Sequence, residues 1–433
     1  MNKIRVSDNR RFLVREDGSP FFYLGDTAWE LFHRLNLGEA TQYLAKRAQQ
    51  RFTVVQAVVL GELDGLHNPN ANGDLPLEGD DPTKPLEPYF GHVDAIVREA
   101  NRLGLTVGML PTWGDKWNRK WGKGPEIFDA VNARVFGEIL GRRYRDADLI
   151  WILGGDRPIE EPRHLEIARA MADGLRAGDG GSHLISFHPM GGGHSSEHLH
   201  QEPWLDFNMI QSGHGARNGR NWEMIARDYL LEPTKPCMDA EPCYENHPVN
   251  WKPEELGWFD EYDVRKAAYR SLFAGSHGHT YGCNDVWQMH REGDEPVGYS
   301  RNLWSEVLGL PGANQMRHVR ALMESRPFLS RIPDQTLVLD DPDEAGEHIQ
   351  ATRCDEGSYA FVYLPKGGHV ALDLQPLHRL ELDAAWYSPR TGDFTPIGRY
   401  SATRAQQFEA PSPLDWVLVL DDPNAGFEPP STE

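Results

Sequence analysis

The chain has 433 residues, of which 39% are apolar and 25% charged, as expected for a globular protein with two domains or one large domain plus an accessory module. No run approaches the roughly 18 apolar residues that a membrane-spanning helix needs. Its 44 Lys and Arg against 65 Asp and Glu give a net charge of −21, which disfavours nucleic acid and anionic membrane surfaces as partners and favours a neutral substrate.

Short apolar runs alternate with helix-like stretches between residues 20 and 290. Each run ends in a polar or glycine-containing tip, and two of them, VVQAVVL and LIWIL, are almost continuously apolar. Strands buried on both faces have this pattern, whereas half-exposed antiparallel strands alternate apolar and polar residues. The eight predicted strands are 21–26, 52–60, 105–111, 149–153, 183–187, 205–210, 235–241 and 279–283.

The segments between these runs predict helices, because apolar residues recur in them at spacings of three and four. Strands that alternate with helices indicate parallel β/α architecture, and eight repeats in about 270 residues match an α/β fold of the (β/α)₈ TIM barrel type. The alternative, a doubly wound open sheet, should carry a glycine-rich phosphate loop after its first strand, and GDTAWEL is not one. The predicted helices are 38–51, 89–103, 127–144, 162–175 and 263–273.

Past residue 328 the pattern changes to short strand-like runs separated by turn residues, with no helical period between them. Runs at this spacing predict a small antiparallel β-sandwich domain. We therefore divide the chain into a barrel domain (1–332), a C-terminal β-sandwich (333–424) and a flexible tail (425–433). We expect the small domain to support the barrel or to form contacts in a homo-oligomer. Its predicted strands are 332–340, 349–353, 359–364, 369–374, 384–388 and 416–420.

The four cysteines, Cys237, Cys243, Cys283 and Cys354, show no C-x-x-C spacing. This argues against a disulfide scaffold and a structural zinc site, so we predict no metal and no cofactor. The N-terminal segment MNKIRVSDNRRF lacks the apolar core of a secretory signal. We therefore expect a cytoplasmic protein with reduced thiols; a signal trimmed from this sequence would make it secreted or periplasmic.

In a barrel of this type the active site forms at the C-terminal tips of the strands. Acids, histidines and tryptophans crowd these tips, and phosphate-gripping loops are missing. No lysine ends a strand, which excludes Schiff-base chemistry. In strand order the tip residues are Asp26 and Trp29, Glu62 and Asp64, Trp113 and Asp115, Asp156, His188, Gln211 and His214, Glu241 and Glu245, and Tyr281, Asp285 and Trp287.

Asp156 and Glu241 are the predicted catalytic pair. Asp156 follows the fourth strand after two glycines, which let the backbone approach a ligand closely. Glu241 ends the seventh strand, and the alternation of side chains predicts that Asp239 also points inward, one layer deeper. Strands four and seven lie three steps apart in a ring of eight, so their tips face each other. A glycosidic bond needs such a pair, one carboxyl to protonate the leaving oxygen and one to stabilise or attack the anomeric carbon.

Eight of the other tip residues are expected to bind a sugar. No H-x-H or H-x-x-x-H spacing supports metal binding by the histidines, so hydrogen bonding to hydroxyls or to the protein is favoured. Aromatic rings suit the flat C–H faces of sugars. Trp113, Trp117 and Trp121 recur every four residues, however, which fits packing under a loop equally well. The predicted substrate-binding residues are Asp26, Trp29, Trp113, His188, Gln211, His214, Tyr281 and Trp287.

The motifs FFYLGDTAWEL, WILGGD and DAEPCYE, with the β-rich C-terminal part, resemble the apiosidase-like glycoside hydrolases of glycoside hydrolase family 140. The resemblance covers residues 11–326, and the remainder resembles the β-sandwich that often follows, sometimes labelled a collagen-binding domain. It implies hydrolysis of a bond to apiose, a branched pentose of plant pectin. It also implies a catalytic aspartate after strand four and glutamate after strand seven, here Asp156 and Glu241. By the roles of these strands in related barrels, Asp156 is expected to be the general acid/base and Glu241 the nucleophile, with retention favoured.

Three other functions remain open at this point. The first is a glycosidase of the same fold that acts on another pentose or plant glycoside. The second is a carbohydrate-binding barrel without catalysis, against which the two intact acids argue. The third is a metal-dependent hydrolase. The glycosidase and the carbohydrate-binding barrel would both have a carbohydrate as the ligand.

Overall fold

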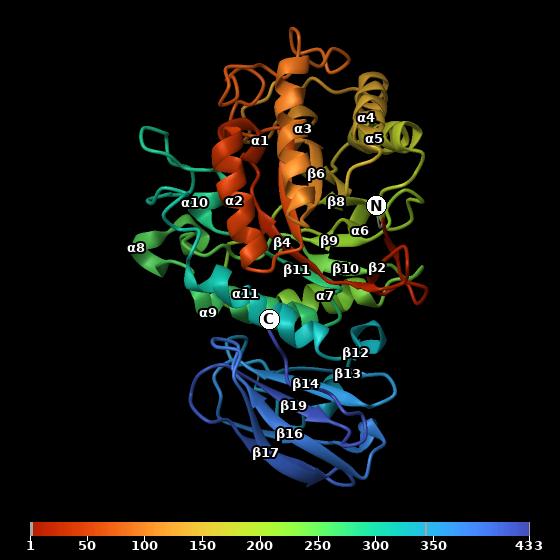
Figure 1. Cartoon of the computed structure of the whole chain (residues 1–433), viewed down its shortest axis with the longest axis vertical. Helices are drawn as coiled ribbons and strands as arrows, with labels where there is room; N and C mark the ends of the chain where they lie inside the picture. The colour runs from red at the N-terminus through yellow and green to blue at the C-terminus, as the bar shows by residue number, and fades with distance from the viewer. Residues whose placement is uncertain (1–2, 343, 433) are drawn as a thin grey trace.

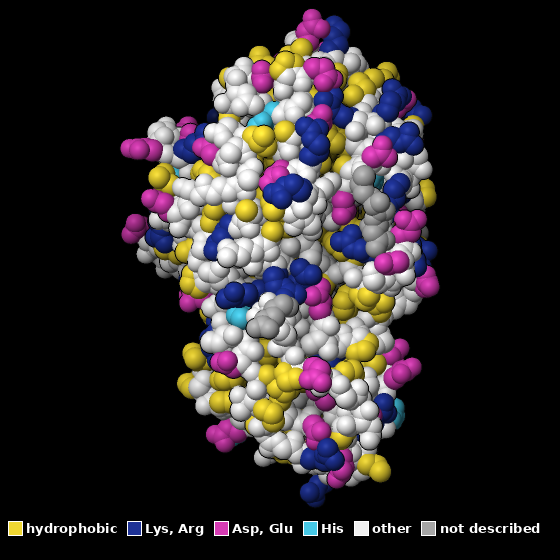
Figure 2. Space-filling view, viewed as in Figure 1, with side chains coloured by type: hydrophobic (Ala, Val, Ile, Leu, Met, Phe, Trp, Pro, Cys, Tyr) yellow, Lys and Arg dark blue, Asp and Glu magenta, His cyan; other side chains and the backbone are white. Residues whose placement is uncertain are grey.

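The computed structural model describes residues 3–342 and 344–432; of the predicted tail, residue 433 lies outside this part. The chain forms a larger α/β part and, below it in Figure 1, a smaller β part built from the C-terminal residues. Acidic and basic side chains are interspersed over the face shown in Figure 2, so the net charge of −21 does not form one patch there. Within the described residues, no helix is long and apolar enough to cross a membrane.

All eight predicted barrel strands are present, each pairing in parallel with its neighbours in the order β8-β7-β6-β5-β4-β11-β10-β9. The ring closes between β8 and β9, where the Asp206 amide donates to Ile185 O over 2.8 Å and Ser186 Oγ to Phe207 O over 2.7 Å. The prediction of a (β/α)₈ barrel is therefore confirmed. The strands are β4 (Tyr23–Thr27), β5 (Val54–Leu60), β6 (Thr106–Thr112), β7 (Leu149–Gly154), β8 (Ile185–His188), β9 (Asn208–Ile210), β10 (Cys237–Asp239) and β11 (Gly278–Tyr281).

The five predicted helices are also confirmed, and polar caps fix where several of them begin. Asn36, Asp129 and Asp260 each accept hydrogen bonds from the first-turn amides that have no partner within the helix. The long helices are α2 (Leu37–Gln49), α3 (Glu87–Arg102), α4 (Ala130–Tyr144), α5 (Pro162–Asp179), α7 (Asn221–Tyr229), α9 (Glu261–Phe273) and α11 (Pro311–Glu324). The short ones are α1 (Leu31–Arg34), α6 (Ser196–Leu199), α8 (Pro253–Leu256) and α10 (Asn284–Trp287).

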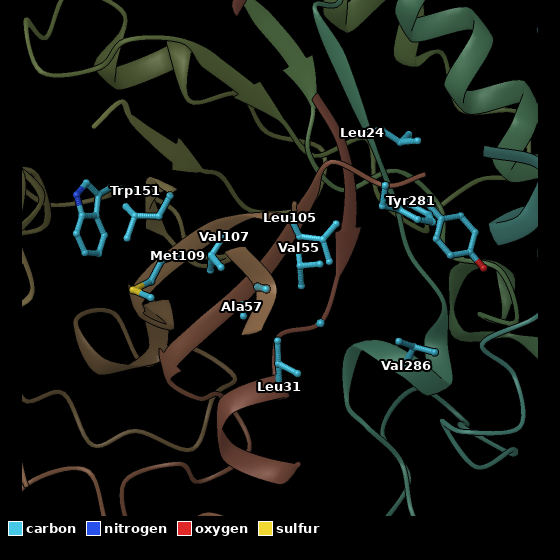
Figure 3. Close-up of a cluster of buried hydrophobic side chains, with 14 of the residues drawn as sticks. Leu24, Leu31, Val55, Ala57, Leu105, Val107, Met109, Trp151, Tyr281 and Val286 are labelled. Carbon is cyan, nitrogen blue, oxygen red and sulfur yellow. The ribbon is translucent and has the colours of Figure 1, made fainter. Parts of the chain in front are cut away.

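Alternate residues of β5 show why its run is apolar throughout. Val54 and Val58 pack inside the barrel, whereas Val55 and Ala57 pack outward against the helices. Figure 3 shows this outer layer, in which Leu24, Val107, Met109 and Trp151 from neighbouring strands join Val55 and Ala57. Both faces of the strand leave water, which is the main stabilising contribution to the barrel.

A small N-terminal sheet was not predicted. Its strands β1 (Ile4–Val6), β2 (Leu13–Arg15) and β3 (Pro20–Phe21) pair antiparallel and lead directly into β4. Strands of two or three residues are too short to show a period in the sequence.

The C-terminal part is antiparallel, as predicted, with a six-stranded and a two-stranded sheet. The predicted run 332–340 is a strand only at its start and then forms a 3₁₀ turn. Two strands, β17 and β18, were missed. The larger sheet holds β12 (Arg331–Pro333), β13 (Gln350–Cys354), β14 (Tyr359–Leu364), β19 (Trp416–Asp421), β16 (Glu381–Tyr387) and β17 (Phe394–Ser401), and the smaller holds β15 (His369–Leu372) and β18 (Gln406–Glu409).

The small part packs against α9, which lies between it and the barrel (Figure 1). Arg265 on this helix donates to both carboxylate oxygens of Asp415 at 3.0 and 3.1 Å, and both side chains are buried. The rings of Tyr269 and Tyr363 stack at 5.1 Å across the same boundary. The sheet face that meets α9 therefore belongs to the same apolar cluster as the outer layer of the barrel, whereas the interior of the sandwich has a cluster of its own.

The start of the predicted flexible tail is packed, which corrects the expectation there. The Phe427 ring lies 6.2 Å from that of Tyr359, and Arg326 donates to Glu428 O over 2.7 Å. The four cysteines are buried free thiols.

Candidate active site

A pocket of about 460 Å³ opens at the carboxyl ends of the barrel strands. Its lining includes three carboxylates, six large aromatic side chains and a set of nitrogen donors. These are Glu62, Asp156 and Glu241; Trp29, Trp113, Trp121, Tyr244, Trp251 and Trp287; and Gln211, His214 and His247. The structure thus brings both predicted catalytic acids to one pocket.

A second hollow, of about 500 Å³, lies at the amino ends of β9 and β10. Its buried charges serve the main chain: Lys235 Nζ donates to Glu202 O and Leu205 O, and Asp206 accepts from the Ile185 amide. The tip pocket therefore remains the candidate active site.

The backbone after β7 turns sharply to present Asp156. The backbone φ angles of Gly154, Gly155 and Asp156 are +93°, +88° and +57°, a region that residues other than glycine rarely adopt. A Cβ on Gly154 would lie 2.2 Å from His188 O, and one on Gly155 2.6 Å from the Gly114 amide nitrogen. Both glycines are thus required by space as well as by conformation. Strain held at a single aspartate in a pocket is typical of functional sites.

Arg157 is the cation beside Asp156. Its Nη1 donates to the main-chain oxygen of Asp156 at 2.7 Å and to Oδ2 at 3.1 Å. Burial nevertheless raises the pKa of Asp156, and the charge of Glu241 raises it further, against the opposing effect of Arg157 and His188. Asp156 is therefore suited to carry a proton that it can donate.

Glu241 has the opposite environment. Gln211 Nε2 donates to Oε1 over 2.9 Å, and His214 Nε2 lies 3.1 Å from the same oxygen. His188 Nε2 lies 3.2 Å from Oε2, out of line for a hydrogen bond but close enough for attraction. Burial raises the pKa of Glu241, yet the imidazoles of His188 and His214 outweigh it and hold the pKa below the usual range. Glu241 therefore stays ionised, as a nucleophile must.

Aromatic rings form the walls around this pair. Trp29 packs 5.1 Å from Trp113 and 5.2 Å from His188, so it is a rigid part of the floor. Trp287 Nε1 donates to Asn284 Oδ1 over 3.2 Å, which fixes the orientation of its ring. Trp29, Trp113 and Trp287 all line the pocket, and their role in binding a sugar stays a prediction.

Two predicted substrate-binding residues, Asp26 and Tyr281, are wrong. The fully buried Asp26 accepts from Arg47 Nε at 2.6 Å and from the Tyr43 hydroxyl, both on α2. The Tyr281 hydroxyl donates to Glu245 Oε2 over 2.5 Å in the outer layer, where Figure 3 also shows its ring. Both side chains occupy the strand face that points to the helices, opposite to the face that lines the barrel.

Asp239 was also predicted on the wrong face. It accepts from Ser212 Oγ over 2.7 Å and from Asn221 Nδ2 on α7 over 3.2 Å, so it points outward. Met238 fills the barrel interior in its place. Strand β10 ends at Asp239, so the alternation does not extend to Glu241.

Several pocket residues are not predicted from the sequence. Glu62 is predicted at a strand tip without a role, and no pattern in the sequence marks Arg157. Tyr244, His247 and Trp251 come from the loop after β10, where no period marks them. The Tyr244 hydroxyl is buried and has no hydrogen-bond partner among the described residues, and its ring lies 4.4 Å from that of His214.

The local backbone decides whether Trp113, Trp117 and Trp121 pack together or line the pocket. Only Gly114–Lys116 is helical, as one 3₁₀ turn, so the spacing does not place the rings on one helix face. Trp117 packs under the loop and donates to Gly154 O over 3.1 Å. Trp121 lines the pocket instead. In the part of the chain that the structure describes, no cluster of three or more His, Cys, Asp or Glu side chains is arranged to hold a metal ion.

Comparison with known families identifies both parts of the chain. A family model described as "Apiosidase-like, catalytic domain" matches residues 7–330, and one described as "Putative collagen-binding domain of a collagenase" matches residues 332–421. No curated protein matches the chain.

Solved structures give the same picture. A protein named "Glycoside hydrolase" has 32% sequence identity and a TM-score of 0.89, over 98% of this chain and 97% of that one. A family 5 glycoside hydrolase from Bacteroides vulgatus ATCC 8482 has 32% identity and a TM-score of 0.89, over 97% and 93%. A family 39 glycoside hydrolase from the gut symbiont Bacteroides cellulosilyticus WH2 shares the fold, with 11% identity and a TM-score of 0.52 over 94% and 84%.

Proposed function

The chain belongs to the apiosidase-like family of glycoside hydrolases, and from this membership we propose that it cleaves an apiosyl linkage in plant-derived glycans or glycosides. Apiose is a branched pentofuranose. The finer assignment to glycoside hydrolase family 140 is part of this proposal. It is supported by the motifs WILGGD and DAEPCYE, which carry Asp156 and Glu241.

One observation carries the catalytic assignment: two carboxyls of one pocket have pKa values displaced in opposite directions. Burial and the charge of Glu241 raise the pKa of Asp156, whereas His188 and His214 overcome burial to lower that of Glu241. Opposed displacement within a pair separates the acid from the base or nucleophile.

In the proposed reaction, Glu241 attacks the anomeric carbon and forms a glycosyl ester. Asp156 gives its proton to the glycosidic oxygen as the bond to the leaving group breaks. Asp156, now ionised, then takes a proton from water, and that water cleaves the ester and restores Glu241. The charge of Glu241 helps to raise the pKa of Asp156 in the free enzyme, which favours the protonated acid. The ester removes that charge, so the pKa of Asp156 falls in the intermediate and the ionised carboxyl can act as a base.

The test is a panel of purified-enzyme assays against apiosides, arabinofuranosides and pectin fragments, with the first-released anomer followed by NMR. We expect release of apiose with retained configuration. Release of another pentose would favour the alternative glycosidase, and an inverted first product would mean that Glu241 activates water instead of attacking.

A further inference from the structure

A third carboxylate, Glu62, enters the pocket from the tip of β5, and among the described residues only Arg157 pairs with it. Its side chain is 18% exposed, and no described residue donates a hydrogen bond to its carboxyl. The nearest cation, Arg157, has Nη2 3.7 Å from Oε1, beyond hydrogen-bond distance. A carboxyl that is mostly buried yet faces an open pocket is available to a ligand.

Glu62 lies on the Asp156 side of the pocket. The charges that act most strongly on it are those of Asp156 and Arg157, and Arg157 also donates to Asp156. Glu241 is held by Gln211 and His214, from the end of β9. Because the acid and the nucleophile act on opposite sides of the anomeric carbon, groups beyond Asp156 face the leaving group.

Trp121 adds an aromatic platform on the same side. Its ring is 62% exposed although Arg157 lies 4.3 Å from its centroid. The neighbouring Gly122 presses on Asp115 and Arg157, where a Cβ would lie 2.3 Å from Asp115 Cβ. Asp115 Oδ2 also accepts from the Gly124 amide over 2.8 Å. The chain that follows Trp121 is thus anchored to Asp115.

We propose that Glu62 and Trp121 form the subsite for a sugar leaving group, with Glu62 bonding its hydroxyls and Trp121 stacking on its ring. The inference rests on the proposed role of Asp156 as the acid. Flat C–H faces of sugars suit an exposed indole.

The protonation of Glu62 fits this role. Burial, with the charge of Asp156, raises the pKa of Glu62 to about 8, against the opposing effect of Arg157. At neutral pH the carboxyl therefore carries a proton. It can both donate to and accept from sugar hydroxyls, as an amide also can.

The test compares two substrates of the same glycone, a glycosyl fluoride and a glycoside with glucose as the leaving group. Glu62→Leu and Trp121→Ala should each lower kcat/KM for the glucoside by about 10–100-fold and for the fluoride by less than about threefold, because fluoride makes no contact in the subsite. Glu62→Gln keeps a hydrogen-bond donor and an acceptor, so it should lower kcat/KM for the glucoside less than Glu62→Leu does. Asp64→Asn is the matched control, since Asp64 bonds to His67 outside the pocket, and it should leave both rates unchanged.

Equal losses on both substrates would overturn the inference, because Glu62 and Trp121 would then act on the glycone or on Glu241 and not on the leaving group. A loss confined to the glucoside but accompanied by a shifted basic limb of its pH profile would overturn it too, because the two residues would then act through Asp156. Unchanged rates on the glucoside would overturn it as well. Trp121 is exposed, so its variant tests the idea even if Glu62→Leu fails to fold. If wild type cleaves neither apioside, the proposed glycone is wrong. The comparison is then made with the fluoride and the glucoside of the sugar that the enzyme does release, and it still tests the subsite.

Discussion

His214 Nε2 lies 3.1 Å from Oε1 of Glu241, and this contact helps to keep the carboxylate ionised inside a buried pocket. His214→Ala removes a group that favours the charged form, so the pKa of Glu241 should rise. The acidic limb of the kcat/KM profile should then move up by about one pH unit, which corresponds to about 1.4 kcal/mol. His198→Ala on α6 is the control, because His198 is exposed and does not line the pocket. An acidic limb that stays in place would contradict this role.

Arg47 and Asp26 form a buried ion pair with Nε and Oδ2 2.6 Å apart, away from the pocket. Arg47→Met should lower the free energy of unfolding by about 3–5 kcal/mol, because it leaves the Asp26 carboxyl buried without its cation. The folded variant should keep the KM of wild type. Lys46→Met, one residue away on the same helix, should change stability by less than about 1 kcal/mol. Urea unfolding measures the stability of both variants. A raised KM of Arg47→Met with unchanged stability would mean that Asp26 acts in substrate binding after all.

Trp287 lines the pocket with its ring held by Asn284. Trp287→Ala should reduce kcat/KM by the equivalent of about 1–3 kcal/mol, because stacking on the sugar is lost. Trp29→Ala should cost as much in kcat/KM and also lower the melting temperature, because Trp29 packs against Trp113. Steady-state kinetics on variants shown to be folded measure this. Unchanged constants for both variants would mean that the two rings only fill the core.

The C-terminal part covers apolar side chains of α9, so removing it should expose apolar surface. A chain that ends at Ser330 loses the partners of Tyr269 and Arg265 on α9. We expect aggregation or a clearly lower melting temperature, seen by light scattering and calorimetry. A shortened chain with full activity and the melting temperature of wild type would show that the sandwich is an independent appendage.

The fold could be predicted where burial requires a run of apolar residues that is visible in the sequence. Strands β5 and β7 are buried on both faces, and their apolar runs are visible in the sequence. Strand β17, FTPIGRYS, has no fully buried residue and therefore no such run, which is why it was missed. The packing of the tail as far as Glu428 was not predicted, because a single contact such as that of Phe427 with Tyr359 leaves no periodic pattern in the sequence.

The site could be predicted only in part for a similar reason. Asp156 and Glu241 follow strands directly, so strand order alone placed them at one mouth. The face on which Asp26 lies depends on the register of β4, and a shift of one residue exchanges inside for outside. Tyr244 comes from a loop, whose path follows from tertiary packing and not from any local pattern.

The central claim is that Asp156 is the general acid/base and Glu241 the nucleophile. Asp156→Asn and Glu241→Gln keep the shape of each side chain but remove its ionisable oxygen. Loss of a general acid costs about 10²–10⁴-fold in rate, and loss of the nucleophile should cost at least as much. Asp64→Asn and Glu254→Gln, which make the same changes outside the pocket, are the controls.

The most direct measurement is kcat/KM of these variants on two glycosides of the same sugar, one with 4-nitrophenol and one with glucose as the leaving group. Nitrophenolate leaves with little protonation. The account therefore predicts that it partly restores Asp156→Asn and does not restore Glu241→Gln, while both variants remain almost inactive on the glucoside. Activity close to wild type in either variant on the glucoside, or equal restoration of both by nitrophenol, would contradict it.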